Sequence, residues 1–258
     1  MIFELIIFLV AGLGAGLVTG LIGLSAVNIV APLLVIFLKF DAYVAIGLAL
    51  GTDVFASLTS SLVYWKKKNV DWKPALIIVA FALIGIFIGS FFGSWVPSNY
   101  LSILVGAGIG VIGFRLAKEG FLREKKKPKV RPSIAKHKKL FVFLFSMIIG
   151  LIAGFFGGGG GLMILILLIS VFNFKIHKAI GTSVLAMTFI AFFSSMFHYI
   201  NIPFSLVGLL IAGITAIFGG FYASHYANKL DEFSLKKIAG IIIVVLGVGM
   251  VLKSVIFI

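Results

Sequence analysis

Two glycine-rich stretches, 134 residues apart, decide the fold of this chain: residues 16–27 read GLVTGLIGLSAV, and residues 150–161 read GLIAGFFGGGGG. The first, fifth and eighth residues of both stretches are glycine. The same offset, without a gap, matches further residues of the two halves: Ala45-Ile46-Gly47 to Ala179-Ile180-Gly181, Ser60-Ser61 to Ser194-Ser195, and Gly85, Gly106 and Gly113 to Gly219, Gly240 and Gly247. An ungapped match of this length is hard to obtain by chance, so the sequence indicates a duplicated module.

The composition is that of a membrane protein. Of the 258 residues, 61% are hydrophobic and 12% are charged, and the mean hydropathy is +1.23; a soluble domain is about half apolar and about 25% charged. A soluble enzyme is therefore excluded, and because the chain has no cysteine, so are a disulfide scaffold and thiol chemistry. At roughly 20 residues per span there is room for about eight to ten transmembrane helices. Ten apolar stretches follow one another along the chain: 2–22, 24–38, 43–64, 74–94, 99–117, 140–156, 162–174, 179–200, 204–224 and 238–257.

These stretches predict an all-α polytopic protein of the lipid bilayer. No cofactor is expected, and no metal site either, because the spans offer one carboxylate and no cysteine cluster.

The positive charges indicate how the chain is oriented. Of its 22 Lys and Arg residues, 11 lie between Arg115 and Lys139. A nucleic-acid-binding protein would carry its basic patch on a folded domain, so the net charge of +14 is better explained by the positive-inside rule, and no nucleic-acid partner is expected. Placing residues 119–139 in the cytoplasm puts 20 of the 22 basic residues inside, and both termini outside, the cell membrane.

The duplication divides the chain into a first membrane repeat (1–118), a basic cytoplasmic linker (119–139) and a second membrane repeat (140–258). Each repeat holds about five hydrophobic segments. The number of crossings is odd whether the segments in 2–38 and 140–174 fully span or are re-entrant, an alternative that the sequence leaves open. The two repeats are therefore expected to be inverted relative to each other. Inverted repeats are typical of secondary transporters, whose substrate binds near the midplane at the repeat interface.

Each repeat is expected to begin with a broken helix. The stretch from Leu162 to Phe174 is 13 residues, or about 20 Å as a helix, whereas the hydrocarbon core is about 30 Å thick. Irregular backbone at membrane depth is tolerated only where it is buried in protein or lines a wet cavity, and the free amides of a helix start suit an anion. The candidate substrate-binding residues are therefore Gly157, Gly158, Gly159, Gly160 and Gly161, with Asn28 and Ser25, which can cap a helix, at the equivalent place in the first repeat. The alternative is that the glycines only let helices pack closely.

Asp53 is the one acidic residue placed well inside a span. A carboxylate in lipid is costly and marks a functional site by default, so Asp53 is the candidate to carry a coupling proton or to hold a cation; a packing role is the alternative. Its counterpart in the second repeat is Met187, so such a role would be asymmetric. Three further candidates place small hydroxyls near the expected cavity, where they can donate to an oxyanion: Thr52, Thr182 and Ser183.

The order and spacing of these motifs resemble the TauE/SafE family of membrane transporters, also called the sulfite exporter or TSUP family. The resemblance covers essentially the whole chain and rests on Gly16–Gly23, Pro32, Ala49–Asp53, Asn69–Trp72, Gly150–Gly161 and Ala179–Ser183. It implies carriage of small sulfur-containing or organic anions, often as export. The chain departs from the family where it has Gly23-Leu24-Ser25-Ala26 in place of a longer glycine run, which shifts the expected anion site toward the second repeat.

The leading functional hypothesis is a secondary transporter, and an exporter, of small anions such as sulfite, sulfonates or related organic anions. It would work by alternating access between the repeats, with proton coupling as one option. An anion channel that uses the same glycine-rich elements is the alternative. The chain is not expected to be an enzyme. An intramembrane aspartyl protease needs two aspartates that share one proton, and apart from Asp53 the aspartates of this chain all lie in loops. The sequence does not decide the substrate, the direction, the coupling ion or the oligomeric state.

Overall fold

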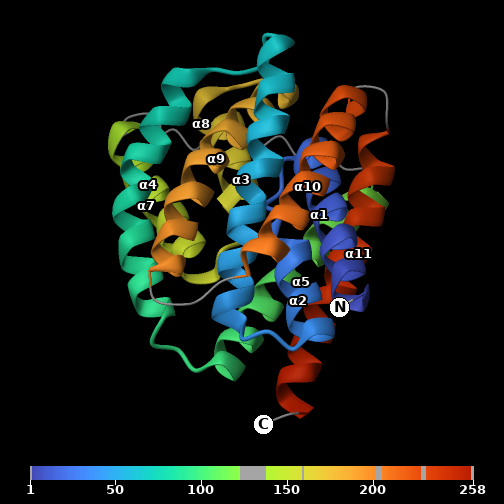
Figure 1. The fold of residues 1–258 in the computed structure, drawn as a ribbon. Coiled ribbons are helices and arrows are strands. Elements are labelled where there is room, and N and C mark those ends of the chain that lie inside the picture. The colour runs from blue at the N-terminus through green and yellow to red at the C-terminus, as the bar shows by residue number, and fades with distance from the viewer. Residues whose placement is uncertain (1, 123–137, 159, 201–204, 228–230, 257–258) are drawn as a thin grey trace.

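The computed structural model of the chain describes residues 2–122, 138–158, 160–200, 205–227 and 231–256, and within these ranges every regular element is an α-helix. The helices are α1 (Ile2–Ile22), α2 (Val27–Leu38), α3 (Ala42–Lys66), α4 (Trp72–Gly93), α5 (Ser98–Leu122), α7 (Lys138–Phe156), α8 (Gly160–Phe172), α9 (Ile176–Tyr199), α10 (Leu206–Tyr226) and α11 (Glu232–Ile256). Figure 1 shows them side by side in one bundle, with α3 and α9 near its centre.

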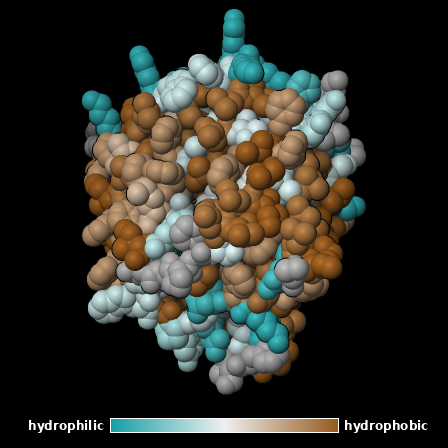
Figure 2. All heavy atoms as spheres, viewed as in Figure 1, coloured by the Kyte–Doolittle hydropathy of each residue, from teal (hydrophilic) through white to brown (hydrophobic). Residues whose placement is uncertain are grey.

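Eight of the described helices are long and apolar enough to cross a membrane, so the predicted all-α, multi-pass fold is confirmed. The two exceptions are α2 and α8, with 12 and 13 residues, or about 18–20 Å each. The surface in Figure 2 agrees with this assignment: a broad hydrophobic band crosses the molecule, and hydrophilic residues gather above and below it. Such a band suits the apolar interior of a bilayer.

The helix breaks lie where the glycine patterns predict them. α1 ends at Ile22 and α7 at Phe156, and the next residues, Gly23 and Gly157, have φ of 76° and 70°. This left-handed backbone is strained for residues with a Cβ, and glycine adopts it freely, so each glycine ends its helix as a C-cap. The chain then turns and starts the short helix of its half.

The helices of the two halves correspond at the same offset as the sequence. α3, α4 and α5 begin 134 residues before α9, α10 and α11, and α1 and α2 end 134 residues before α7 and α8. Most of the predicted linker lies outside the described residues. Its ends belong to helices, because α5 continues to Leu122 and α7 begins at Lys138.

Equivalent helices pack against each other in opposite directions. In the α5–α11 pair, Gly106 faces Gly247 and Gly113 faces Gly240, so one helix ascends while the other descends. In the α3–α9 pair, the Tyr199 hydroxyl near the end of α9 donates to the carbonyl of Gly47 near the start of α3 (2.8 Å).

The outer helices form the pairs α1–α10 and α4–α7, and in both pairs the two helices run the same way. Gly12 faces Ala212 and Gly20 faces Ala223 in the first pair, and a Cβ on Gly85 would lie 2.0 Å from the carbonyl oxygen of Met147 in the second. Backbones this close require glycine, as in other membrane helix pairs. Close packing therefore accounts for many of the glycines outside the two breaks.

Candidate functional site

A small cavity lies where the two helix breaks meet. It is lined by residues of both halves: Ser25, Leu50, Asp53, Ala153, Gly157, Gly160, Gly161, Met187, Ile190 and Ala191. Its volume is about 10 Å³, which is room for about one water molecule. In this conformation the cavity is therefore too small for an anion of several heavy atoms.

The polar side of the cavity is the pair Ser25 and Asp53. The Ser25 hydroxyl donates to Oδ2 of Asp53 at 2.6 Å, and the Asp53 side chain, 2% exposed, has no hydrogen-bond partner for Oδ1 among the described residues. A carboxylate so buried is costly when charged, because the low-dielectric surroundings replace its hydration only in part. Ser25 and Asp53 therefore form the polar part of an otherwise largely apolar lining.

The first turn of α2 fixes Ser25 in place. Its carbonyl accepts from the Asn28 side-chain amide at 3.0 Å, and its hydroxyl accepts from the Val27 amide at 3.3 Å. Ala26, directly before α2, already has helical dihedrals, with φ −55° and ψ −26°. The Ser25 hydroxyl therefore meets the amide two residues further on, as the side chain of a capping residue does.

The second break supplies backbone to the cavity. A Cβ on Gly161 would lie 2.4 Å from the carbonyl oxygen of Gly23, so the two breaks touch through main-chain atoms. Gly160 and Gly161 begin α8, and the first amides of a helix have no acceptor within it. Gly158 lies beside the Asn28 side chain, whose Oδ1 is buried without a partner in the described part of the chain, and Gly159 lies outside the described residues.

The structure places the other predicted site residues away from the cavity lining. The Thr52 hydroxyl donates to the Leu48 carbonyl at 2.9 Å, and that of Ser183 donates to the Ile180 carbonyl at 2.8 Å, both within their own helix. Thr182 instead accepts a hydrogen bond from the Asp71 amide at 3.0 Å, in the connection between α3 and α4. Ser183 nevertheless lies against the first break, because a Cβ on Gly23 would be 3.2 Å from its hydroxyl oxygen.

The apolar half of the cavity lining was not predicted. Leu50, Met187 and Ile190 contribute side chains from α3 and α9. The repeat could have predicted Met187 as a lining residue, because Met187 is the counterpart of Asp53 in the second half. Leu50 and Ile190 carry no sequence signal that separates them from other core residues.

The fold and the site together are those of a multi-pass membrane transporter: many apolar spans surround a central cavity built from broken helices and a buried carboxylate. The model of the sulfite exporter TauE/SafE family matches residues 8–250, and the chain belongs to this family.

The similar proteins are transporters by name. The chain is 26% identical to the probable membrane transporter protein YunE of Bacillus subtilis, over 98% of this chain and 99% of that one. It is 22% identical to the probable membrane transporter protein YdhB of the same organism, over 92% and 94%, and 24% identical to a probable membrane transporter protein of Xylella fastidiosa, over 97% and 96%. No solved structure matches the chain. The protein is therefore a membrane transporter and not an enzyme.

Proposed function

We propose that this protein is a secondary transporter of small anions that works by alternating access between two inverted repeats in the cell membrane. The observation that carries the proposal is the central cavity, in which a buried carboxylate from one repeat meets the glycine break of the other. The opposite directions of the equivalent helices α5 and α11 support the inversion. Inverted halves around a midplane site are the usual architecture of alternating access.

An anion is the substrate class that the glycine break fits best. Gly160 and Gly161, the first residues of α8, line the cavity, and the first amides of a helix have no acceptor within it and lie at the positive end of its dipole. The one acidic residue there, Asp53, would repel an anion when charged, so we infer that it takes up a proton as the anion binds and that the two are carried together. Sulfite, sulfonates and related organic anions are the candidates, with export as the direction that the family description favours.

The size of the cavity favours a carrier over a channel. A space for about one water molecule does not let an oxyanion pass, so transport requires the helices around Leu50 and Ile190 to move. A channel that uses the same glycine-rich elements remains the second candidate, and single-channel currents would support it.

The test is flux into proteoliposomes that hold the purified protein. We expect saturable, pH-gradient-dependent uptake of at least one member of a panel of sulfite, sulfate, methanesulfonate and acetate. Empty liposomes and a matched panel of inorganic cations serve as controls. Flux that rises linearly for every anion, or that equals the flux of empty liposomes, would contradict the proposal.

A further inference from the structure

His198 is a buried histidine near the end of α9, and only one of its two ring nitrogens has a hydrogen-bond partner. Its side chain is 1% exposed. Nδ1 lies 2.9 Å from the carbonyl oxygen of Ser194, and because a carbonyl can only accept, we assign the proton of the neutral ring to Nδ1. Nε2 is then an acceptor without a partner among the described residues. A buried nitrogen in this state calls for an explanation.

The ring of Tyr43 covers His198. The two rings are stacked, with their centroids 4.2 Å apart and their planes at 20°. Tyr43 lies in the first turn of α3, and its hydroxyl donates to the Ser90 carbonyl of α4 at 3.2 Å. The stack therefore ties the end of α9 to α3 and α4, at the end of the molecule that the positive-inside rule places outside.

His198 continues the face of α9 that lines the central cavity. Ala191 lines the cavity, and Ser194 and His198 follow it at helical spacings of three and four residues, so all three lie on one face. The Ser194 hydroxyl is also buried without a partner in the described part of the chain, as is Oδ1 of Asp53 in the cavity. The rise from Ala191 to His198 is about 10 Å. Unpartnered polar groups thus lead from the outer end of α9 to the carboxyl group.

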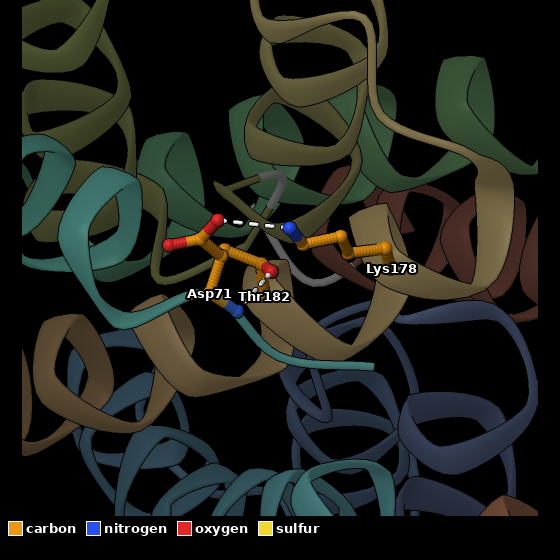
Figure 3. A network of polar contacts seen from close by, with 3 residues as sticks. All are labelled: Asp71, Lys178 and Thr182. Atoms are coloured by element: carbon orange, nitrogen blue, oxygen red, sulfur yellow. Dashed lines mark hydrogen bonds and ion pairs between the residues drawn. The ribbon is translucent and has the colours of Figure 1, made fainter. Parts of the chain in front are cut away.

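A proton on Nε2 has no place in this conformation. The new N–H bond would lie in the plane of the imidazole ring, whereas the Tyr43 ring lies over its face, where it attracts a cation but does not accept from that bond. At the other end of α9, by contrast, the Lys178 ammonium meets the Asp71 carboxylate at 2.9 Å (Figure 3). A charge buried without such a partner is costly. A protonated His198 must therefore leave Tyr43 and reach water.

Few other ionisable groups face this end of α9. Tyr43 and Asp41 come from the start of α3, where the exposed Asp41 carboxylate accepts from the Tyr43 amide at 2.9 Å, and the neighbouring Tyr199 donates its hydroxyl to the Gly47 carbonyl. The other helices packed against α9 are α1, α4, α7 and α8. Their ionisable residues all lie in first turns: Glu4, Lys73, Lys138 and Lys139. Of these residue types and histidine, only histidine ordinarily gains its proton between about pH 5 and 8.

The opposite end of the molecule lacks this group. The counterpart of His198 in the first half is Tyr64. The two are placed alike, because a Cβ on Gly47 would lie 3.2 Å from the His198 Cβ, and a Cβ on Gly181 would lie 2.9 Å from that of Tyr64. Tyr64, however, donates its hydroxyl to the Gly20 carbonyl at 2.9 Å and is satisfied. A group of this kind therefore belongs to one end only.

We propose that His198 relays protons between the outer solution and Asp53, and that protonation of Nε2 opens the outer end of the path by parting His198 from Tyr43. This inference rests on the proposed function for its proton coupling. The proton binds to Nε2, and the imidazolium leaves the stack for water. It then passes, through water admitted beside Ser194, to Oδ1 of Asp53, which leaves the ring neutral and lets the stack close. The reverse order releases a proton to the outside.

The variant Ser194→Cys reports whether the path is open, because the chain has no cysteine and this position is buried. Its rate of reaction with a charged, water-soluble thiol reagent is measured on the detergent-purified protein at about pH 8 and about pH 5. The rate is divided by that of Asn99→Cys, an exposed position, which corrects for the loss of thiolate at low pH. We expect the normalised rate to be at least about fivefold higher at the lower pH.

The histidine is tested by adding a second substitution to Ser194→Cys. His198→Gln should remove the rise, since glutamine takes up no proton in this range. His177→Gln is the matched control, because it replaces an exposed histidine at the start of the same helix, and it should keep the rise. A normalised rate that is the same at both pH values without these substitutions, or that rises as much in His198→Gln, would overturn the proposal.

Tyr43 allows a test that keeps His198, in case the loss of the histidine prevents folding. Tyr43→Leu removes the stacked ring, so Ser194→Cys should react fast at both pH values, whereas Tyr43→Phe keeps the stack and should keep the pH dependence. Slow reaction of the Tyr43→Leu protein at both pH values would contradict the proposal.

These rates measure opening without flux. Opening that depends on His198, with no transport of any anion, would refute the proposed function alone. Proton-coupled anion uptake without this opening would refute the relay alone.

Discussion

At the scale of single residues, the site is asymmetric in a way that suits proton coupling. Asp53 and Met187 hold the same position in the two halves and both line the cavity, yet only one can bind a proton. The Ser25 hydroxyl donates to one carboxylate oxygen and leaves the other without a partner among the described residues. Under the proposed function, a single carboxyl at the cavity would carry one proton per transport cycle.

Replacing Asp53 by asparagine tests this assignment. Asparagine keeps an oxygen that can accept from Ser25 but cannot release a proton at any working pH. We expect the rate of uptake driven by a pH gradient to fall by at least about a hundredfold, which corresponds to an activation free energy higher by about 2.7 kcal/mol or more. The melting temperature should not fall, because the variant no longer buries an ionisable group. Both are measured on the same purified sample.

Met187→Leu is the matched control for a change in the cavity lining, since it adds no polar group, and its uptake should still depend on the pH gradient even where the rate changes. Asp53→Asn protein that still accumulates anions in response to pH would rule out Asp53 as the proton carrier.

Part of this site can be predicted from the sequence. The rest depends on which way each helix face points and on how the two halves pack. Asp53 and Ser25 stand out because polar groups are expensive at membrane depth, and both line the cavity. Thr52 and Ser183 stand out for the same reason, but a hydroxyl in a helix can bond to a carbonyl of its own preceding turn, and in both residues it does. The contact between Asp71 and Lys178 joins residues 107 positions apart and follows only from the packing of the two halves.

At the scale of helices, glycine does two different things. Gly157 has a left-handed backbone that ends α7, whereas Gly85 is an ordinary helical residue whose missing side chain lets α4 approach α7. The same residue type gives a break in one place and a tight interface in the other, and sequence alone separates them only where glycines run together. The five consecutive glycines predicted the second break directly, and the repeat offset carried the prediction to Gly23.

The break can be tested by alanine substitution. Gly157→Ala forces a Cβ into left-handed backbone and places it 2.5 Å from the Ile46 side chain, so we expect a loss of about 1–2 kcal/mol from the backbone alone. Gly160→Ala is the control, because its Cβ would meet its neighbours only at 3.8 Å. That change should be neutral or slightly stabilising, by up to about 1 kcal/mol. Melting temperatures of the two variants in detergent decide, and equal values would argue against a strained break.

The helix interfaces allow a similar comparison. Gly85→Ala places a methyl group 2.0 Å from the carbonyl oxygen of Met147, so α4 and α7 must separate, and we expect a clear fall in melting temperature. Gly108 on α5 has no atom within 4 Å of such a methyl group. Gly108→Ala should therefore be neutral, or stabilising by up to about 1 kcal/mol through helix propensity. A Gly85→Ala protein as stable as wild type would show that α4 and α7 can separate enough to hold the methyl group without a loss of stability.

At the scale of the whole molecule, the helices of the two halves are paired in a regular way. Each outer pair, α1–α10 and α4–α7, joins one helix from each half in the same direction, whereas equivalent helices such as α5 and α11 run in opposite directions. This exchange of partners is what a two-fold axis in the membrane plane produces. The exposed ion pair between Asp71 and Lys178 joins the two halves and contributes only about 0–1 kcal/mol to their association.

The arrangement of the repeats can be read from labelling, because the chain has no cysteine and any introduced thiol is unique. Single cysteines at Asn99 and Val207, which are exposed in the first turns of α5 and α10, should react with a membrane-impermeant maleimide on intact cells. Cysteines at Lys66 and Lys175, also exposed, should react only after permeabilisation, because the positive-inside rule places them in the cytoplasm. Lys66 ends α3 while Lys175 precedes α9, so labelling of both from one side means that these equivalent helices cross in opposite directions. Reaction of Lys66 and Lys175 from opposite sides would refute the inverted repeats, and reversal of all four results would refute only the assignment of the cytoplasmic face.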